Sequence, residues 1–241
     1  MSYRLNHYLA LCGVCSRRAA DRIIEEGRVR VNGQTASLGV KVEDSDIVTL
    51  DDREIRPEER DILIAVNKPV GVVCTEAHFS GEKTLASLVN AGTRVFSIGR
   101  LDKDSSGLIL MTNNGALAQE IAGGSNRHEK EYVVGVNRPV TEDFLIAMRG
   151  GVDIDIDGNI RRTRPCRVKK SGLQEFHIVL TQGMNRQIRR MCRALGYSVR
   201  SLSRIRVMNI ELGDLAPGCW RYLSEAEAED VRKSCVAKEV K

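Results

Sequence analysis

The spacing of apolar residues near the N-terminus predicts two short helices followed by strands. Leu5, Tyr8 and Leu9 recur at helical spacing before Gly13 interrupts the pattern. The stretch SRRAADRIIEEG predicts a second helix, which Ser16 is placed to cap. Alternation in RVRVNGQTA, with Asn-Gly in the middle, predicts a β-hairpin, and VKVEDSDIVTL ends in a further strand.

Beyond residue 60, strand and helix patterns mix without regular alternation. The stretch ILIAVNKPVGVVCT predicts two buried strands broken at Lys68-Pro69, and SGLILMT, EYVVGV, VDIDID and EFHIVLTQG predict later strands. Helical spacing predicts helices near residues 83–90, 115–122, 141–149, 185–195 and 224–232. Because a strict βαβ order is missing, we expect an α+β domain built on a mixed, largely antiparallel sheet with flanking helices.

The charged stretch DDREIRPEERD at 51–61 separates the two regions. It contains Pro57 and few apolar residues, which is typical of a linker. We therefore expect a small domain at residues 1–55, a linker at 56–60 and a larger domain at 61–241.

Charge is distributed unevenly along the chain. Residues 161–206 contain 13 Lys and Arg but one acid, Glu175, so this segment carries +12. Since the whole chain carries +5, the remainder carries −7. Such a concentration of positive charge indicates a nucleic-acid partner.

The stretch NRQIRRMCRALG predicts an amphipathic helix at the end of this basic segment. One face comprises Ile188, Met191, Cys192 and Leu195, and the opposite face comprises Arg186, Arg189, Arg190 and Arg193. Arginines without interspersed acids favour contact with phosphates. Arg189 lies nearest the apolar edge, beside Cys192, and is placed to reach inward to a buried carboxylate.

Two short motifs imitate metal sites but lack a required part. CGVC at 12–15 has no second pair of ligands at a distance suited to zinc. DIDIDG at 153–158 has Arg164 where an EF-hand loop requires glutamate, and its alternation predicts a strand. No glycine-rich phosphate loop occurs either, so we expect neither a metal nor a nucleotide cofactor.

The location of the protein is predicted from what the chain lacks. No stretch approaches the ~20 apolar residues of a membrane span, and the N-terminus has no signal-peptide core. Seven scattered cysteines suit reduced thiols. We expect a cytoplasmic monomer with no membrane partner.

The N-terminal unit resembles the S4 RNA-binding domain. The resemblance covers nearly the whole unit and is carried by CSRRAADRIIEEGRVRVNG. It implies RNA binding through a local arginine face, which includes Arg17, Arg18 and Arg22.

The rest of the chain resembles the RNA pseudouridine synthases that modify single uridines in ribosomal RNA. VNKPVG, GRLDKDSSGLILMTNNG, HEKEYVV and QGMNRQIRRMC stand in that family's order and at its spacing, and the resemblance extends to about residue 225. It implies an isomerase that converts uridine to pseudouridine in 23S ribosomal RNA without a cofactor. Members can carry a long basic C-terminal tail that contacts RNA, and the sequence departs from this pattern, because it reaches only Lys241.

The resemblance also implies roles for individual residues. Asp102 would be the catalytic carboxylate, with Tyr132 packed on the target base and Arg189 paired with Asp102. The expected RNA contacts are Arg100, Leu101, Lys103, Asn185, Arg186, Arg190 and Arg193, besides the three arginines of the S4 unit. Asp104 precedes Ser105-Ser106-Gly107, where a carboxylate can cap a turn through backbone N–H groups.

Two alternatives remain from the sequence. The same chemistry could act on a tRNA stem-loop, or the chain could be a non-catalytic RNA-binding or ribosome factor of the S4 type. The second alternative gives no reason for Asp102, Tyr132 and Arg189 to occur together.

Overall fold

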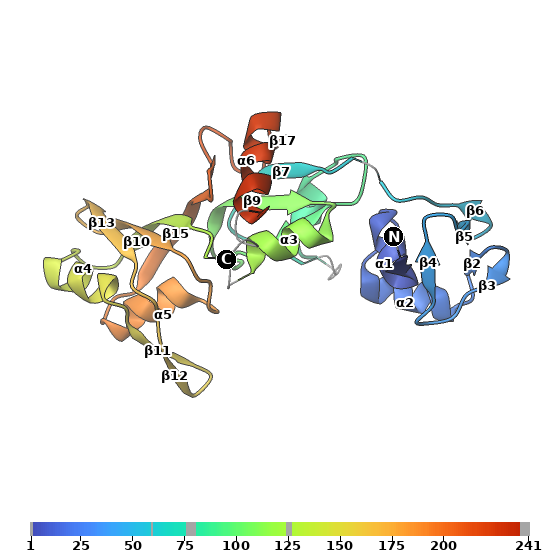
Figure 1. Ribbon diagram of the computed structural model, residues 1–241. Coiled ribbons are helices and arrows are strands. Elements are labelled where there is room, and N and C mark those ends of the chain that lie inside the picture. The colour runs from blue at the N-terminus through green and yellow to red at the C-terminus, as the bar shows by residue number, and fades with distance from the viewer. Residues whose placement is uncertain (1, 59, 76–80, 124–126, 237–241) are drawn as a thin grey trace. The chain divides into compact units, whose positions relative to one another are not determined.

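The computed structural model describes residues 2–58, 60–75, 81–123 and 127–236, which form two compact units (Figure 1). The smaller unit comprises residues up to 62 together with 90–96 and 112–115, and the larger unit comprises the rest. The end of the chain at Lys241 lies outside the described residues. Within the described ranges, no helix is long and apolar enough to cross a membrane.

The smaller unit consists of two helices and short strands. Its elements are β1 (Ser2–Arg4), α1 (Leu5–Leu11), α2 (Arg17–Glu25), β2 (Val29–Val31), β3 (Gln34–Thr35), β4 (Lys41–Glu43), β5 (Val48–Leu50) and β6 (Arg53–Glu54). Strand β1 pairs with β4, and the others form a sheet in the order β3-β2-β5-β6. The predicted cap is confirmed, because the Ser16 hydroxyl accepts from the backbone N–H of Ala19 at 3.3 Å. The predicted hairpin is confirmed too, with Asn32 and Gly33 at φ +51° and +80°.

The larger unit is built on one mixed sheet. Its strands are β7 (Leu63–Lys68), β8 (Phe96–Ile98), β9 (Ser106–Thr112), β10 (Lys130–Val136), β13 (Arg167–Gly172), β14 (Glu175–Leu180), β15 (Val199–Val207), β16 (Ile210–Glu211) and β17 (Trp220–Tyr222). The main order is β13-β14-β10-β15-β9-β7-β17, with β16 beside β15 and β8 beside β9. The helices are α3 (Gly115–Ala122), α4 (Glu142–Arg149), α5 (Gln187–Ala194) and α6 (Glu225–Val236). The expected α+β class is confirmed.

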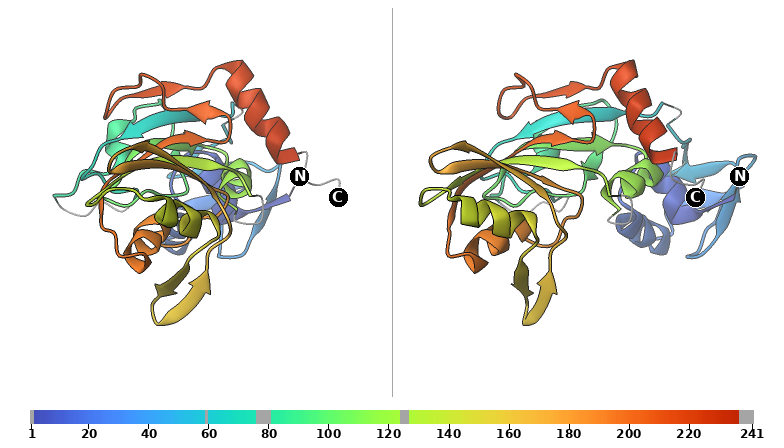
Figure 2. Two further views of the ribbon diagram at one scale, coloured as in Figure 1. Left: turned by 90° about the vertical axis from the view of Figure 1, so that its left-hand side faces the viewer. Right: turned by 60° about the vertical axis from the view of Figure 1, so that its left-hand side comes forward.

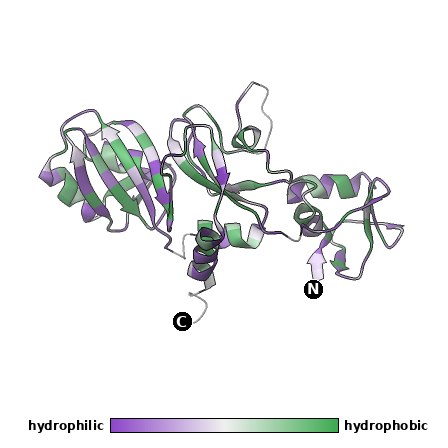
Figure 3. Ribbon diagram, turned by 90° about the horizontal axis from the view of Figure 1, so that it is seen from above, coloured by the Kyte–Doolittle hydropathy of each residue, from purple (hydrophilic) through white to green (hydrophobic). Residues whose placement is uncertain are grey.

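Two hydrophobic clusters cover different parts of this sheet. Helices α4 and α5 pack with β10, β13 and β14, whereas α3 and α6 pack with β7 and β9. Leu202 belongs to the first cluster and Val207 to the second, so β15 contributes side chains to both clusters. Figure 3 shows the resulting alternation of hydrophobic and hydrophilic bands along the strands.

A parallel contact between β9 and β15 joins the two halves of the sheet. Ser106 pairs with Ser203 and Gly107 with Arg204. Gly107 has φ +100°, and a Cβ placed on it would lie 2.2 Å from the Arg204 carbonyl oxygen. Only glycine fits this approach without moving a strand.

Two of the expected elements differ from the structure. The stretch after Pro69 does not form a second strand: the chain turns at Gly71, whose φ is +91°, and makes an isolated bridge between Val73 and Thr84. Residues 76–80 of this region lie outside the described residues. The helix expected at 83–90 is a single 3₁₀ turn, Leu85–Leu88.

The acidic DIDIDG motif forms a strand, as its alternation predicts, and this strand is the first of a hairpin. Strand β11 (Asp153–Ile156) pairs with β12 (Asn159–Arg162). The Asp155 carboxylate accepts from the backbone N–H of Gly158 at 2.7 Å, so it closes the turn.

We predict that Gly107→Ala destabilises the larger unit by about 2–4 kcal/mol, because the added Cβ overlaps the β15 backbone and sits at a positive φ. Gly218→Ala is the matched control, since Gly218 has φ +83° but nothing within 4 Å of its Cβ position; it should cost about 1 kcal/mol. The measurement is urea unfolding followed by fluorescence of Trp220, the chain's one tryptophan. Equal losses for the two variants would contradict the prediction.

Candidate active site

Asp102 lies in the loop between β8 and β9, and hydrogen bonds hold the backbone of this loop before and after Asp102. Leu101 is buried, and its N–H donates to the Cys74 sulfur at 3.5 Å. The N–H of Ser105 donates to the Asp102 carbonyl at 3.1 Å. The Asp102 side chain is 31% exposed.

A cavity of about 300 Å³ opens beside Asp102. Six residues singled out from the sequence line it: Arg100, Leu101, Asp102, Tyr132, Asn185 and Arg186. The remaining lining residues are Ser105, Leu180, Gln182, Gly183, Met184, Gln187, Ile188 and Leu202. One wall thus comes from the Asp102 loop, one from β10 and β14, and one from the turn into α5. Such a cavity, apolar in part and containing a carboxylate and an aromatic ring, suits a small planar group.

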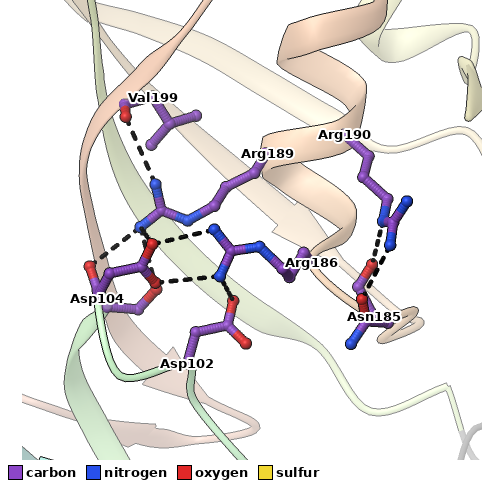
Figure 4. A network of polar contacts seen from close by, with 8 residues as sticks. Asp102, Asp104, Asn185, Arg186, Arg189, Arg190 and Val199 are labelled. Carbon is purple, nitrogen blue, oxygen red and sulfur yellow. Dashed lines mark hydrogen bonds and ion pairs between the residues drawn. The ribbon is translucent and has the colours of Figure 1, made fainter. Parts of the chain in front are cut away.

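Two arginines of the α5 region meet two aspartates of the loop (Figure 4). Arg186 contacts Asp104 at 3.0 Å and Asp102 at 3.4 Å. Arg189 contacts the Asp104 carboxylate at 3.2 Å and also donates to the Asp104 carbonyl at 3.0 Å. We call these four side chains the ion cluster.

The expected pairing of Arg189 with Asp102 is wrong, since Arg186 makes that contact. Helix α5 begins at Gln187, and Arg186 precedes it with a left-handed backbone, φ +49° and ψ +33°. Arg186 therefore does not lie on the solvent face of the helix, where regular helical spacing places it. Arg189 instead donates to the Val199 carbonyl at 3.5 Å and to the Ser105 hydroxyl at 3.4 Å.

The expected turn-capping role of Asp104 is also wrong. The Asp104 carboxylate accepts hydrogen bonds from Arg186 and forms an ion pair with Arg189, while the N–H of Ser105 donates to the Asp102 carbonyl. Burial alone would raise the pKa of Asp104, but the hydrogen bond from Arg186 and the charges of Arg189 and Arg186 hold it below its ordinary value.

Arg190 binds its own chain rather than facing solvent. It donates to the Asn185 carbonyl at 3.1 Å, to the Asn185 side chain at 3.2 Å and to the Asp155 carbonyl. Its guanidinium also lies 3.7 Å from the Asp157 carboxylate, and its side chain is 26% exposed. The expectation that Arg190 binds RNA is therefore not supported by the structure.

The other basic side chains expected to contact RNA differ in whether they form an ion pair within the chain. Lys103 pairs with Glu82 at 2.8 Å. Arg100 and Arg193 are exposed and make no ion pair with any described residue. In the smaller unit the same holds for the α2 arginines, which are Arg17, Arg18 and Arg22.

Two buried cations near the site were not singled out from the sequence. Lys68 is fully buried and donates to the carbonyls of Pro69 at 3.0 Å and Val72 at 2.8 Å, so it shapes the turn that follows β7. Burial lowers the pKa of Lys68, against the opposing effect of the nearby anionic groups, including Asp102. Arg204 lies opposite Tyr132 on β15 and donates to the Leu108 carbonyl at 2.6 Å. The position of Lys68 in the apolar run ILIAVNK indicates from the sequence that this lysine is buried. Nothing comparable in the sequence around Arg204 indicates that it is buried.

Residues 62–194 match the family model for RNA pseudouridylate synthase, and residues 4–48 match that for the S4 domain. The chain is 47% identical over 235 residues to the dual-specificity RNA pseudouridine synthase RluF of Escherichia coli, which covers 96% of this chain and 79% of that protein. It is 32% identical over 237 residues to the ribosomal large subunit pseudouridine synthase B of Bacillus subtilis, covering 95% of each. A crystal structure of pseudouridylate synthase matches with a TM-score of 0.69 at 27% identity, over 95% of this chain and 99% of that one.

We predict that Asp104 stabilises the larger unit in a pH-dependent way. A carboxyl whose pKa is lowered by folding contributes stability above its ordinary value of 3.8, and loses it as pH falls through the folded pKa. Asp104→Asn should therefore lower stability at pH 7, by less than about 1 kcal/mol because the side chain is half exposed. The deficit should shrink between pH 5 and pH 3 in urea unfolding.

The control for this prediction is Asp214→Asn, which removes an exposed carboxylate that makes no ion pair with any described residue. This variant should unfold like the wild type at each pH. A deficit for Asp104→Asn that stays constant down to pH 3 would show that the lost charge is not its cause.

Proposed function

The chain belongs to the RNA pseudouridylate synthase family, and from this we propose that it converts particular uridines of large-subunit ribosomal RNA to pseudouridine through Asp102. The observation that carries the proposal is the meeting of Asp102 and Tyr132 in one cavity of about 300 Å³. Ribosomal RNA is the proposed substrate because the Bacillus subtilis relative is a large-subunit enzyme. The segment with 13 basic residues and one acid supports a polyanionic partner.

The reaction is an isomerisation that balances without a co-reactant. The bond between the ribose and N1 of uracil breaks, the base rotates, and C5 joins the same ribose carbon while the C5 proton leaves for the vacated nitrogen through solvent or a side chain. A carboxylate can attack the base or the sugar, or take a proton from the sugar. Each route requires an anionic Asp102, and the Arg186 guanidinium at 3.4 Å supplies the opposite charge.

The target base must leave its stack before it can enter the cavity. An aromatic side chain inside the cavity replaces part of the stacking that the base loses. Tyr132 is the one aromatic residue among the described residues that line the cavity. We propose that its ring packs on the uracil and that its hydroxyl handles the C5 proton.

The exposed arginines would hold the flanking RNA. Arg100 lines the cavity, and Arg193 lies on the exposed side of α5, so both are available for phosphates. Arg189 would act indirectly, by holding Asp104 and Ser105 and thereby the loop that carries Asp102. A second substrate, which we propose to be a tRNA stem-loop, is favoured by the dual specificity of the Escherichia coli relative.

We predict that Asp102→Asn abolishes pseudouridine formation, because an amide cannot serve as the anionic group, while RNA binding changes little. Asp104→Asn should keep measurable activity, since Asp104 acts through the arginines. The measurement is tritium release from C5-labelled uridine in 23S RNA by each purified variant. Substantial release by the Asp102 variant would overturn the assignment of the catalytic aspartate.

We predict that the S4 unit contributes affinity but not chemistry. Replacing Arg17, Arg18 and Arg22 together by alanine should weaken binding to 23S RNA and lower the salt slope of log K by up to about 3. The rate at saturating RNA should not change. A reduced saturating rate with unchanged salt slope would mean that these arginines act in the reaction rather than in binding.

A further inference from the structure

The β11–β12 hairpin with the residues that follow it, 153–164, forms an arm that projects from the larger unit beside α5 (Figures 1 and 2). The base of the arm is fixed. Ile154 is buried in the cluster with α4 and α5. Thr163 is buried as well, and its hydroxyl accepts from the N–H of Val152 at 2.8 Å. The arm is thus a defined element of the fold.

Arg190 connects this arm to the wall of the cavity. Its guanidinium binds the Asp155 carbonyl and the Asp157 carboxylate in the arm, and its other donors bind Asn185. Asn185 lines the cavity next to Arg186. A ligand that contacts the arm while its base occupies the cavity would therefore meet one connected surface.

The acidic side chains of the arm are already engaged by the chain itself. Asp153 pairs with Arg162 at 3.0 Å, Asp155 accepts from the N–H of Gly158, and Asp157 lies near Arg190. Asp153 and Asp157 are therefore each beside an arginine, whereas the charge of Asp155 is held only by a backbone hydrogen bond.

The other arm residues are open to a partner. Arg161 and Arg164 are exposed and have no acidic partner among the described residues. Ile160 is 70% exposed, which is the highest value among the exposed large apolar side chains of the described residues. Ile160 and Arg161 are consecutive on a strand, so they point to opposite faces of the ribbon.

We infer that this arm is a second contact for the RNA whose uridine enters the cavity, an inference that rests on the proposed function. Arg161 and Arg164 bind phosphates beside the target nucleotide. Ile160 packs against a base that loses its neighbour when the uridine leaves the stack, as apolar side chains do when they enter nucleic acids between bases. Two free cations and an exposed apolar side chain on one arm fit a polyanion with exposed base faces better than they fit an acidic protein surface.

The first test compares RNA binding and turnover with in vitro transcribed 23S RNA. Arg161→Ala with Arg164→Ala should raise KM on the order of tenfold, lower the salt slope by about 2 and leave kcat unchanged. Ile160→Ser should lower kcat/KM several-fold with the salt slope unchanged. The matched controls are Arg232→Ala on α6 and Ile146→Ser on α4, which are exposed residues outside the arm; both should behave as wild type.

The second test is independent of turnover. The same RNA, transcribed with 4-thiouridine, is irradiated with wild-type protein and the crosslinked peptides are identified by mass spectrometry. We expect crosslinks within residues 159–164, and fewer of them in the Arg161→Ala, Arg164→Ala variant. Kinetics like wild type for all arm variants, together with no crosslink in the arm, would overturn the inference. Lack of tritium release by the wild-type protein, with arm crosslinks present, would instead refute the proposed function.

Discussion

The ion cluster is the interaction on which the site depends. Asp102 and Asp104 lie two residues apart, and their like charges oppose a close, partly buried arrangement unless cations stand beside them. Arg186 and Arg189 provide these cations from a segment more than 80 residues later in the chain. The cluster thus fixes the loop before β9 against the start of α5, and the cavity lies where these two segments and β10 meet. Removing one member would leave the charges of the cluster unbalanced, at a cost limited by the partial exposure of its side chains.

The arginines of the basic segment divide into two groups that composition does not separate. Arg189, Arg190 and Arg204 donate hydrogen bonds to backbone carbonyls of the chain itself. Arg206 pairs with Glu129 at 3.2 Å and Glu131 at 3.0 Å, which are acids outside the segment. The charge that RNA meets is therefore smaller than the +12 counted along the sequence. The exposed arginines without a partner remain to set the salt dependence of binding.

Features that depend on neighbouring residues could be predicted from the sequence. The helices and the hairpin of the smaller unit followed from spacing, a cap at Ser16 and the Asn-Gly turn, because each is a local backbone preference. Which of Arg186 and Arg189 contacts Asp102 could not be predicted from the sequence, because the answer depends on the residue at which α5 begins. Arg186 has a left-handed backbone, which non-glycine residues adopt only when surrounding contacts compensate. Those contacts come from Asp102 and Asp104, so the local conformation is a consequence of tertiary structure. The contacts of Arg190 could not be predicted for the same reason. Its partners Asp155 and Asp157 lie on a hairpin whose position relative to α5 cannot be derived from the sequence pattern.

The junction of β9 and β15 explains why Asp102 and Tyr132, the proposed site residues, lie in one cavity. Asp102 leads into β9, whereas Tyr132 lies on β10, which pairs with β15. The distance between the two side chains is therefore set by how closely β9 approaches β15. Gly107 allows that approach because it has no Cβ, and the buried Arg204 fixes it by donating to the Leu108 carbonyl at 2.6 Å. A larger residue at 107 would separate the strands and with them the two walls of the cavity. The constraint thus acts on backbone spacing, and the position of the two proposed site residues depends on a glycine, which has no side chain.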